Sequence, residues 1–202
     1  MFLINCTFFA QFGFNKKINM KKFLSLALCS GILLMGTALR AQNDSSKTKP
    51  PEDKSKRPSP PATATATTSN GVTINIDYSQ PSVKGREIGK AVEPMKGKVW
   101  RTGANEATVF EVNKDVTING KPLKAGKYGL FSLWNGDTWT IIFNKTWNQW
   151  GAFNYKQADD VLRVNVKNMP PATPSEKMTF NVGDDGKVSL AWGNIGFDFM
   201  VK

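Results

Sequence analysis

Polar and apolar residues alternate along the chain from residue 71 onward, and this period of two is the feature that most restricts the fold. In the first run, Val72, Ile74 and Ile76 are separated by single polar residues. Such alternation places the apolar side chains on one face of a β-strand. Similar short runs recur as far as the C-terminus, and no long segment has the 3.6-residue period of an amphipathic helix. The pattern predicts an all-β domain, a single antiparallel β-sandwich of about eight or nine short strands, with a squat β-barrel as the alternative.

Two Asn-Gly pairs predict tight turns between neighbouring strands. Asn119-Gly120 would join residues 115–118 to 121–123, and Asn135-Gly136 would join residues 127–134 to 137–144. If Asn135-Gly136 form the whole loop, the turn alone fixes the pairing of the second hairpin. Its core face then holds three cross-strand pairs, which are Tyr128 with Phe143, Leu130 with Ile141, and Ser132 with Trp139.

Tyr128 also belongs to the phrase Gly126-Lys127-Tyr128. This phrase is typical of the corner of a β-sandwich at which a Tyr hydroxyl returns to nearby backbone. We expect Tyr128 to have a structural role.

The N-terminal third lacks the alternation and is predicted to divide into three segments. Residues 20–41 combine two lysines with an apolar run that ends in small residues, the pattern of a signal peptide cleaved after Ala41. A membrane-spanning signal anchor is the alternative. Residues 1–19 are interpreted as an upstream extension, with Met20 as the true start. Residues 42–70 are rich in Pro, Ser, Thr and Lys and predict a disordered tether whose last residues can pair as a first strand.

The domain proper is therefore expected at residues 71–202, in a protein that is exported to the periplasm or the outside of the cell. After signal cleavage we expect no membrane span. The net charge of +11 overstates the basicity of this mature protein, because cleavage removes five basic residues and no acidic one. The remaining Lys and Arg form no cluster interleaved with aromatic residues, so nucleic acid is not an expected partner.

The composition excludes several kinds of chemistry. The chain has no histidine, and its two cysteines, Cys6 and Cys29, lie in the segment that cleavage would remove. The mature chain thus lacks a thiol nucleophile, a His general base, and His or Cys ligands for zinc or haem. We expect no cofactor and no metal, and what remains is carboxylate, Lys, Tyr or Ser chemistry or no catalysis.

The first candidate site is the phrase Trp100-Arg101-Thr102-Gly103-Ala104-Asn105-Glu106-Ala107. If residues 102–105 form a four-residue hairpin loop, Arg101 stands opposite Glu106 on one face and Trp100 opposite Ala107 on the other. A buried Arg–Glu pair is costly and is often kept for orientation or function, whereas an exposed pair only staples a turn. Both interpretations are open at this stage.

The second candidate site is the aromatic segment 144–155, which includes Trp147, Asn148 and Trp150. Aromatic rings that alternate with amides suit a sugar, because a ring can stack on the apolar face of a pyranose while amides bond its hydroxyls. The same composition also suits a self-packed loop that closes one end of a sandwich.

Several phrases of the chain resemble those of a family of exported bacterial proteins known only as a domain of unknown function. They are Tyr78-Ser79-Gln80-Pro81, the more specific Trp100-Arg101-Thr102-Gly103-Ala104-Asn105-Glu106, Ala125-Gly126-Lys127-Tyr128, and Trp147-Asn148-Gln149-Trp150-Gly151. The resemblance runs from about Arg57 to the C-terminus. It implies export and a single β-rich domain. Since the family carries no established activity, it assigns no catalytic residue.

The favoured hypothesis is a non-enzymatic binder of a glycan or another polar small molecule. Its binding residues would be Arg101, Asn105, Glu106, Trp147, Asn148 and Trp150. The hypothesis requires both candidate segments to lie at the same end of the sandwich. One alternative is a carboxylate-dependent hydrolase centred on Glu106, which requires a second acid about 5 to 10 Å away. Another is a structural protein of the cell envelope, and the oligomeric state is left open.

Overall fold

The computed structural model describes residues 52–202, and the fold of this part is almost entirely antiparallel β-structure. The predicted upstream extension (1–19), the signal peptide (20–41) and the first ten residues of the predicted tether lie outside the described residues. Within residues 52–202, no helix is long and apolar enough to cross a membrane.

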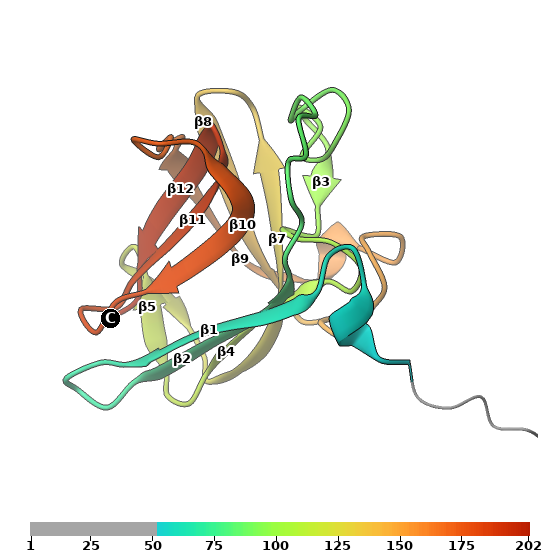
Figure 1. The fold of residues 1–202 in the computed structure, drawn as a ribbon. Helices are drawn as coiled ribbons and strands as arrows, with labels where there is room; N and C mark the ends of the chain where they lie inside the picture. The colour runs from blue at the N-terminus through green and yellow to red at the C-terminus, as the bar shows by residue number, and fades with distance from the viewer. Residues whose placement is uncertain (1–51) are drawn as a thin grey trace, which may run out of the picture. The chain divides into compact units, whose positions relative to one another are not determined.

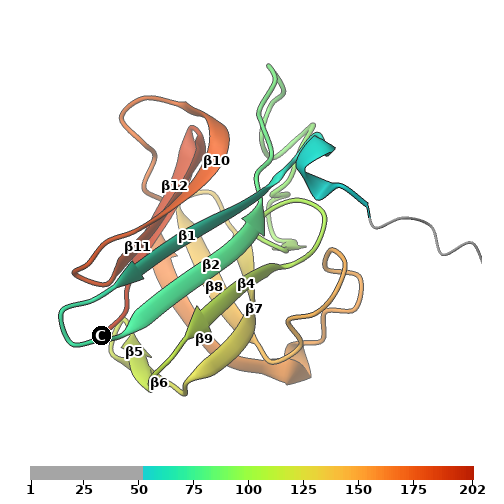
Figure 2. The same cartoon turned by 60° about the horizontal axis from the view of Figure 1, so that its bottom comes forward.

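The larger sheet has seven strands, which come from residues 61–167 (Figure 2). Its order is β1 (Pro61–Thr67), β2 (Thr73–Ser79), β4 (Thr108–Val112), β7 (Gly126–Trp134), β8 (Thr138–Asn144) and β9 (Asp160–Lys167). The short β3 (Val99–Trp100) also pairs with β7, beyond the end of β4.

The second sheet contains the C-terminal strands β10 (Ser175–Val182), β11 (Lys187–Gly193) and β12 (Ile195–Met200), which lie together against one side of the larger sheet (Figure 1). A small hairpin is formed by β5 (Val116–Ile118) and β6 (Lys121–Leu123), and two 3-10 helices are η1 (Lys54–Lys56) and η2 (Gln157–Asp159). No sheet closes on itself. The predicted all-β antiparallel sandwich is confirmed, and the barrel alternative is wrong.

The core lies between the two sheets and is built from aromatic rings. Phe110 of β4 and Phe143 of β8 meet edge to face, with ring centroids 5.0 Å apart. Phe199 of β12 contacts both rings across the sandwich. All three rings are at most 2 % exposed. Edge-to-face packing of large rings buries the apolar area that holds the sheets together.

The opposite face of the larger sheet has a smaller apolar cluster of its own. Phe131 and Ile142, from the β7–β8 hairpin, are completely buried there, with Ala107 beside them. Tyr155 covers this cluster, its ring 5.1 Å from that of Phe131. The segment between β8 and β9 therefore packs on this face, and the β7–β8 hairpin is buried on both sides.

The predicted turn at Asn119-Gly120 and the predicted Tyr corner are both confirmed. Asn119 and Gly120 have φ angles of 47° and 81° between β5 and β6, as a two-residue turn of mirror-image type requires. The Tyr128 hydroxyl donates to the Lys124 carbonyl at 2.9 Å.

The register predicted for the β7–β8 hairpin is wrong by two residues. Trp134 pairs with Trp139 and the Asn135 amide donates to the Thr138 carbonyl, so the turn is centred on Gly136-Asp137 and not on Asn135-Gly136. Leu130 consequently faces Phe143 and not Ile141. Since a shift of two preserves the side on which each residue points, the predicted core face is correct although its pairs are not.

The predicted tether extends too far into the domain. Residues 61–67, Pro-Ala-Thr-Ala-Thr-Ala-Thr, form the whole of β1 and pair with β2 from end to end. Ala64 is buried, and the threonines alternate with the alanines at the strand period. Low hydrophobicity suggested disorder, but a neighbouring strand supplies the hydrogen bonds that this edge segment needs.

Candidate functional site

The segment 101–107 leaves the larger sheet and returns to it without forming a hairpin. Both β3 and β4 run antiparallel to β7, so they point in the same direction along one edge of it. The loop therefore connects β3 and β4, two short strands that pair with successive parts of β7. The predicted hairpin is therefore wrong, and so are the predicted pairs of Arg101 with Glu106 and Trp100 with Ala107.

Hydrogen bonds inside the loop fix its shape. The Trp100 Nε1 donates to the Gly103 carbonyl at 3.0 Å, and the Thr108 hydroxyl donates to the Thr102 carbonyl at 2.8 Å. Thr102 and Asn105 adopt left-handed φ angles of 53° and 58°. Such angles are uncommon outside glycine, and they bend the chain out of the sheet at both ends of the excursion.

The two segments singled out in the sequence lie against each other. The Ala107 amide donates to the Gln149 carbonyl at 3.0 Å, and the Gly151 amide donates to the Asn105 carbonyl at 2.9 Å. Between these bonds, Glu106 and Trp150 form an isolated antiparallel bridge. The two loops thus form one surface at the same end of the sandwich.

A partly buried polar network anchors the segment 145–156 at its C-terminal end. The Tyr155 hydroxyl donates to the Asp160 carboxylate at 2.7 Å and accepts from Arg163 at 2.7 Å. Asn144 also donates to Asp160, at 2.8 Å. Burial, together with the bond to Asp160, raises the pKa of Tyr155 to about 12. Tyr155 is therefore a neutral anchor and no general base at ordinary pH.

Three aromatic rings on this anchored segment remain open to solvent. Trp147 is 38 % exposed, Trp150 is 53 % exposed and Phe153 is 84 % exposed. A cation lies over each tryptophan, with Lys127 5.6 Å from the Trp147 ring and Arg57 5.5 Å from the Trp150 ring. Exposed rings gathered on one loop are characteristic of an interaction surface.

Arg57 completes this surface from the segment before β1. Its guanidinium forms two bonds to the Glu106 carboxylate, at 2.8 and 3.0 Å, and two to Glu52, at 2.8 and 2.6 Å. Lys54 adds a contact of 2.8 Å to Glu106. Sequence reasoning missed Arg57 because the residue stands in a Pro-rich stretch without a pattern. Its only signal was that the family resemblance begins there.

Glu106 is consequently held in its charged form. Burial acts to raise the pKa of its carboxyl group, but hydrogen bonds from Lys54 and Arg57 outweigh burial, so the pKa is lowered. A general acid needs a raised pKa. Among residues 52–202, no group of three or more acidic side chains is placed to hold a metal ion.

The six predicted binding residues therefore separate into two groups. The Asn105 amide donates to the Ser59 carbonyl at 2.9 Å, and Glu106 is bound by Lys54 and Arg57. Trp147, Asn148 and Trp150 lie on the adjoining exposed surface. Arg101 lines a different pocket, together with Glu93, Trp100 and Trp192, but its Nη1 also lies 3.9 Å from the position that a Cβ of Gly151 would occupy, beside Trp150.

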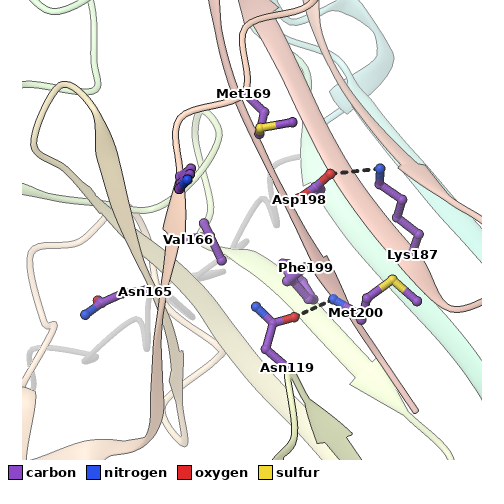
Figure 3. A pocket seen from close by; sticks show the side chains of 9 residues that line it. Asn119, Asn165, Val166, Met169, Lys187, Asp198, Phe199 and Met200 are labelled. Carbon is purple, nitrogen blue, oxygen red and sulfur yellow. Dashed lines mark hydrogen bonds and ion pairs between the residues drawn. The ribbon is translucent and has the colours of Figure 1, made fainter.

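A further pocket of about 400 Å³ opens between β9 and β12, at a place without a sequence motif. Val166, Met169 and Phe199 give it a largely apolar floor (Figure 3). Several of its polar side chains are engaged, as in the Lys187–Asp198 ion pair of 2.8 Å and the bond from the Met200 amide to Asn119. The residues that form this pocket are far apart in the chain, so no local pattern could reveal it.

Comparison with known proteins gives a family and no function. Residues 59–201 match the family model described as a protein of unknown function (DUF2911). No curated protein and no solved structure matches the chain. The family match covers both sheets, the paired loops and all six predicted binding residues. The chain belongs to the DUF2911 family.

Proposed function

We propose that this chain is a non-catalytic, exported binding protein that recognises a glycan through the exposed rings of residues 147–153. The observation that carries the proposal is the exposure of Trp150 and Phe153, at 53 % and 84 %, on a loop that is otherwise tightly bonded. Exposure of an apolar ring to water is unfavourable, and a ligand that covers the ring gains the free energy of burying it. A pyranose presents an apolar face of matching size.

The rigid support of these rings favours recognition. The backbone next to Trp150 is bonded on both sides to segment 105–107, and Arg57 lies over the ring. The Gln149 side chain donates to the Thr146 carbonyl at 2.8 Å within the same loop. A ligand that meets rings already held in place does not have to order the loop on binding, and this increases its affinity.

Polar groups around the rings suit the hydroxyls of a sugar. Asn148 is exposed between the two tryptophans, and the Lys54 ammonium and the Glu106 carboxylate lie at the edge of the ring surface. Amide and charged groups at the rim can bond hydroxyls while the rings stack. This combination favours a glycan over a purely apolar partner.

The hydrolase alternative has less support. Glu106 is bound by two cations, and its lowered pKa does not suit proton donation. Glu52 is bonded to Arg57 and is also shifted toward the charged form, mainly by that hydrogen bond. Asp77 lines the same pocket as Glu106, but its carboxylate accepts from Thr63 and Asn75. Neither Glu106 nor Glu52 is prepared to act as the acid of a glycosidase pair.

Isothermal titration with neutral oligosaccharides of cello, chito and galactan type tests the proposal. We expect one of these classes to bind, and we expect Trp150→Ala and Phe153→Ala each to weaken binding by about tenfold. Met169→Ala is the matched control, because Met169 is similarly exposed, at 51 %, but lies in the pocket between β9 and β12. Equal binding by all three variants, or no binding of any class, would contradict the proposal and favour a structural role in the envelope.

A further inference from the structure

A separate pocket of about 380 Å³ lies between loop 101–104, the irregular segment 86–95 and the end of β11. Its volume is in the range of small-molecule sites. Arg101 and Trp192 both line it, and the indoles of Trp100 and Trp192 stack there with centroids 5.8 Å apart. No part of the exposed ring surface at Trp150 lines this pocket.

Two nitrogen atoms of the pocket residues are buried N–H donors without an acceptor. They are the Arg101 Nε and the Trp192 Nε1, neither of which has a hydrogen-bond partner among residues 52–202. The Trp192 side chain is only 2 % exposed, so solvent does not serve its N–H. Buried donors are nearly always paired, and an unpaired one often marks the place of a missing partner. Two of them in the residues of one pocket point to a ligand with acceptor oxygens.

The charge of the pocket fits a ligand with one negative charge. Arg101 makes no ion pair with any described carboxylate, and Arg86 bonds only to the carbonyls of Ser82 and Val83. Glu93 is the one acidic side chain in the lining, and its carboxylate accepts from the Met95 amide. Two guanidinium groups against one carboxylate leave a single positive charge. Burial lowers the pKa of Arg101, with Glu93 acting in the opposite direction, and the guanidinium stays protonated.

An apolar part of the lining comes from Ala91, Val92, Met95 and the two stacked indoles, and Ser59 adds a further polar side chain. Such walls suit a hydrocarbon or aromatic body and do not suit the many hydroxyls of a sugar. Segment 86–95 contains no strand of the two sheets, so this wall can move more easily than the strands behind it.

We propose that this pocket binds a small organic monocarboxylate. The carboxylate bonds to the Arg101 guanidinium and accepts the Trp192 indole N–H, and the apolar body of the ligand lies against Val92 and Met95. Arg is well suited to planar carboxylates. Phosphate fits less well, because Glu93 opposes a second negative charge and the apolar wall offers it no donors. The pocket adjoins the proposed glycan surface, because the Arg101 guanidinium also lies close to Gly151 beside Trp150, but the monocarboxylate proposal does not rest on glycan binding.

Nuclear magnetic resonance of the ¹⁵N-labelled protein tests the proposal, with benzoate as the probe. Benzamide has the same ring without the charge, and inorganic phosphate has the charge without the ring. We expect benzoate to shift the Trp192 indole N–H resonance in a saturable manner, and we expect benzamide and phosphate to bind at least about tenfold more weakly. Arg101→Met should weaken benzoate binding by at least about tenfold.

Two further variants serve as controls for the indole N–H signal and for the effect of charge. Trp192→Phe removes the N–H but keeps a ring, and the weakened binding is then followed on the Trp100 resonance. Lys167→Gln removes a charge at the pocket between β9 and β12 and should leave benzoate binding unchanged. No saturable shift with benzoate, equal binding of benzamide, or unaltered binding by a folded Arg101→Met protein would overturn the proposal.

Discussion

Thr102 shows how a single residue shapes the loop between β3 and β4. It is a β-branched residue with a left-handed φ of 53°, and it is completely buried. Such a conformation is strained for a branched side chain. The Thr102 hydroxyl donates to the Ser132 hydroxyl of β7 at 2.9 Å, and the Thr102 carbonyl accepts from Thr108. The sequence Thr-Gly-Ala-Asn indicates a turn, but it does not reveal these contacts with other strands.

Replacing Thr102 should separate the contribution of its hydroxyl from that of its shape. Thr102→Val keeps the branched shape and leaves Ser132 without its buried partner, so we expect a loss of about 1–3 kcal/mol in the free energy of unfolding. Thr102→Ser keeps the hydroxyl and removes the branch, and should change stability by less than about 1 kcal/mol. Urea denaturation measures both values. Equal losses in the two variants would show that the hydrogen bond contributes little.

Glu106 should make part of the stability dependent on pH. Its folded-state pKa lies below the ordinary value of 4.5, so its ion pairs contribute fully above that pH and are lost as the pH falls through the folded pKa. The carboxylate is 37 % exposed, and screening limits the contribution to about 1 kcal/mol or less. Urea denaturation of the native protein and of Glu106→Gln should show a difference at pH 7 that shrinks below about pH 4.5. A difference that stays constant down to pH 3 would contradict this account.

At the scale of elements, the segment between β8 and β9 is held at its middle and at its C-terminal end. Its middle is bonded to segment 105–107, and its end is fixed by the network of Tyr155, Asp160 and Arg163. The sequence left two interpretations of this segment, a self-packed loop and a recognition surface. Tyr155 packs on Phe131, as expected of a self-packed loop, while Trp150 and Phe153 are exposed, and the recognition surface stays a proposal that rests on this exposure.

Tyr155→Phe tests the anchor of this segment. The variant keeps the ring on Phe131 and removes the hydroxyl between Asp160 and Arg163, so we expect a loss of about 1–3 kcal/mol in stability. Faster amide hydrogen exchange in residues 145–156 should accompany it. Tyr128→Phe is the matched control, because it removes a Tyr hydroxyl from the corner before β7 and should leave exchange in residues 145–156 unaltered. Unchanged exchange in Tyr155→Phe would mean that other contacts hold the loop.

For the whole molecule, alternation was enough to predict an antiparallel sandwich and the buried face of its central hairpin. The period of two determines which side chains face the core, but it does not determine where a turn lies, and a turn centred one residue later than predicted shifted the pairs by two. The sequence did not predict that the two candidate segments are neighbours. It gave their proximity only as a requirement of the binding hypothesis. Arg57 and the pocket at Arg101 and Trp192 depend on contacts between residues far apart in the chain, which no local pattern carries.

The position of the domain start can be tested on the whole chain. A protein that begins at Glu52 keeps β1 and should unfold cooperatively. A protein that begins at Gly71, where the sequence places the domain, loses β1 and exposes the edge of β2. We expect that loss to be a large fraction of the roughly 5–15 kcal/mol typical of a domain, with aggregation through the open edge. Circular dichroism during heating compares the two, and equal melting would show that β1 is dispensable.

The central claim is that the paired loops form a glycan-binding surface. The chain contains six tryptophans, whose indole N–H resonances report separately on the exposed loop, the Arg101 pocket and the core. The most direct measurement is a titration of the ¹⁵N-labelled protein with an oligosaccharide that binds by calorimetry. The account predicts saturable shifts of Trp147 and Trp150, with Trp139 and Trp192 unmoved. Shifts confined to Trp192, or no shift of Trp147 and Trp150 at saturation, would contradict it.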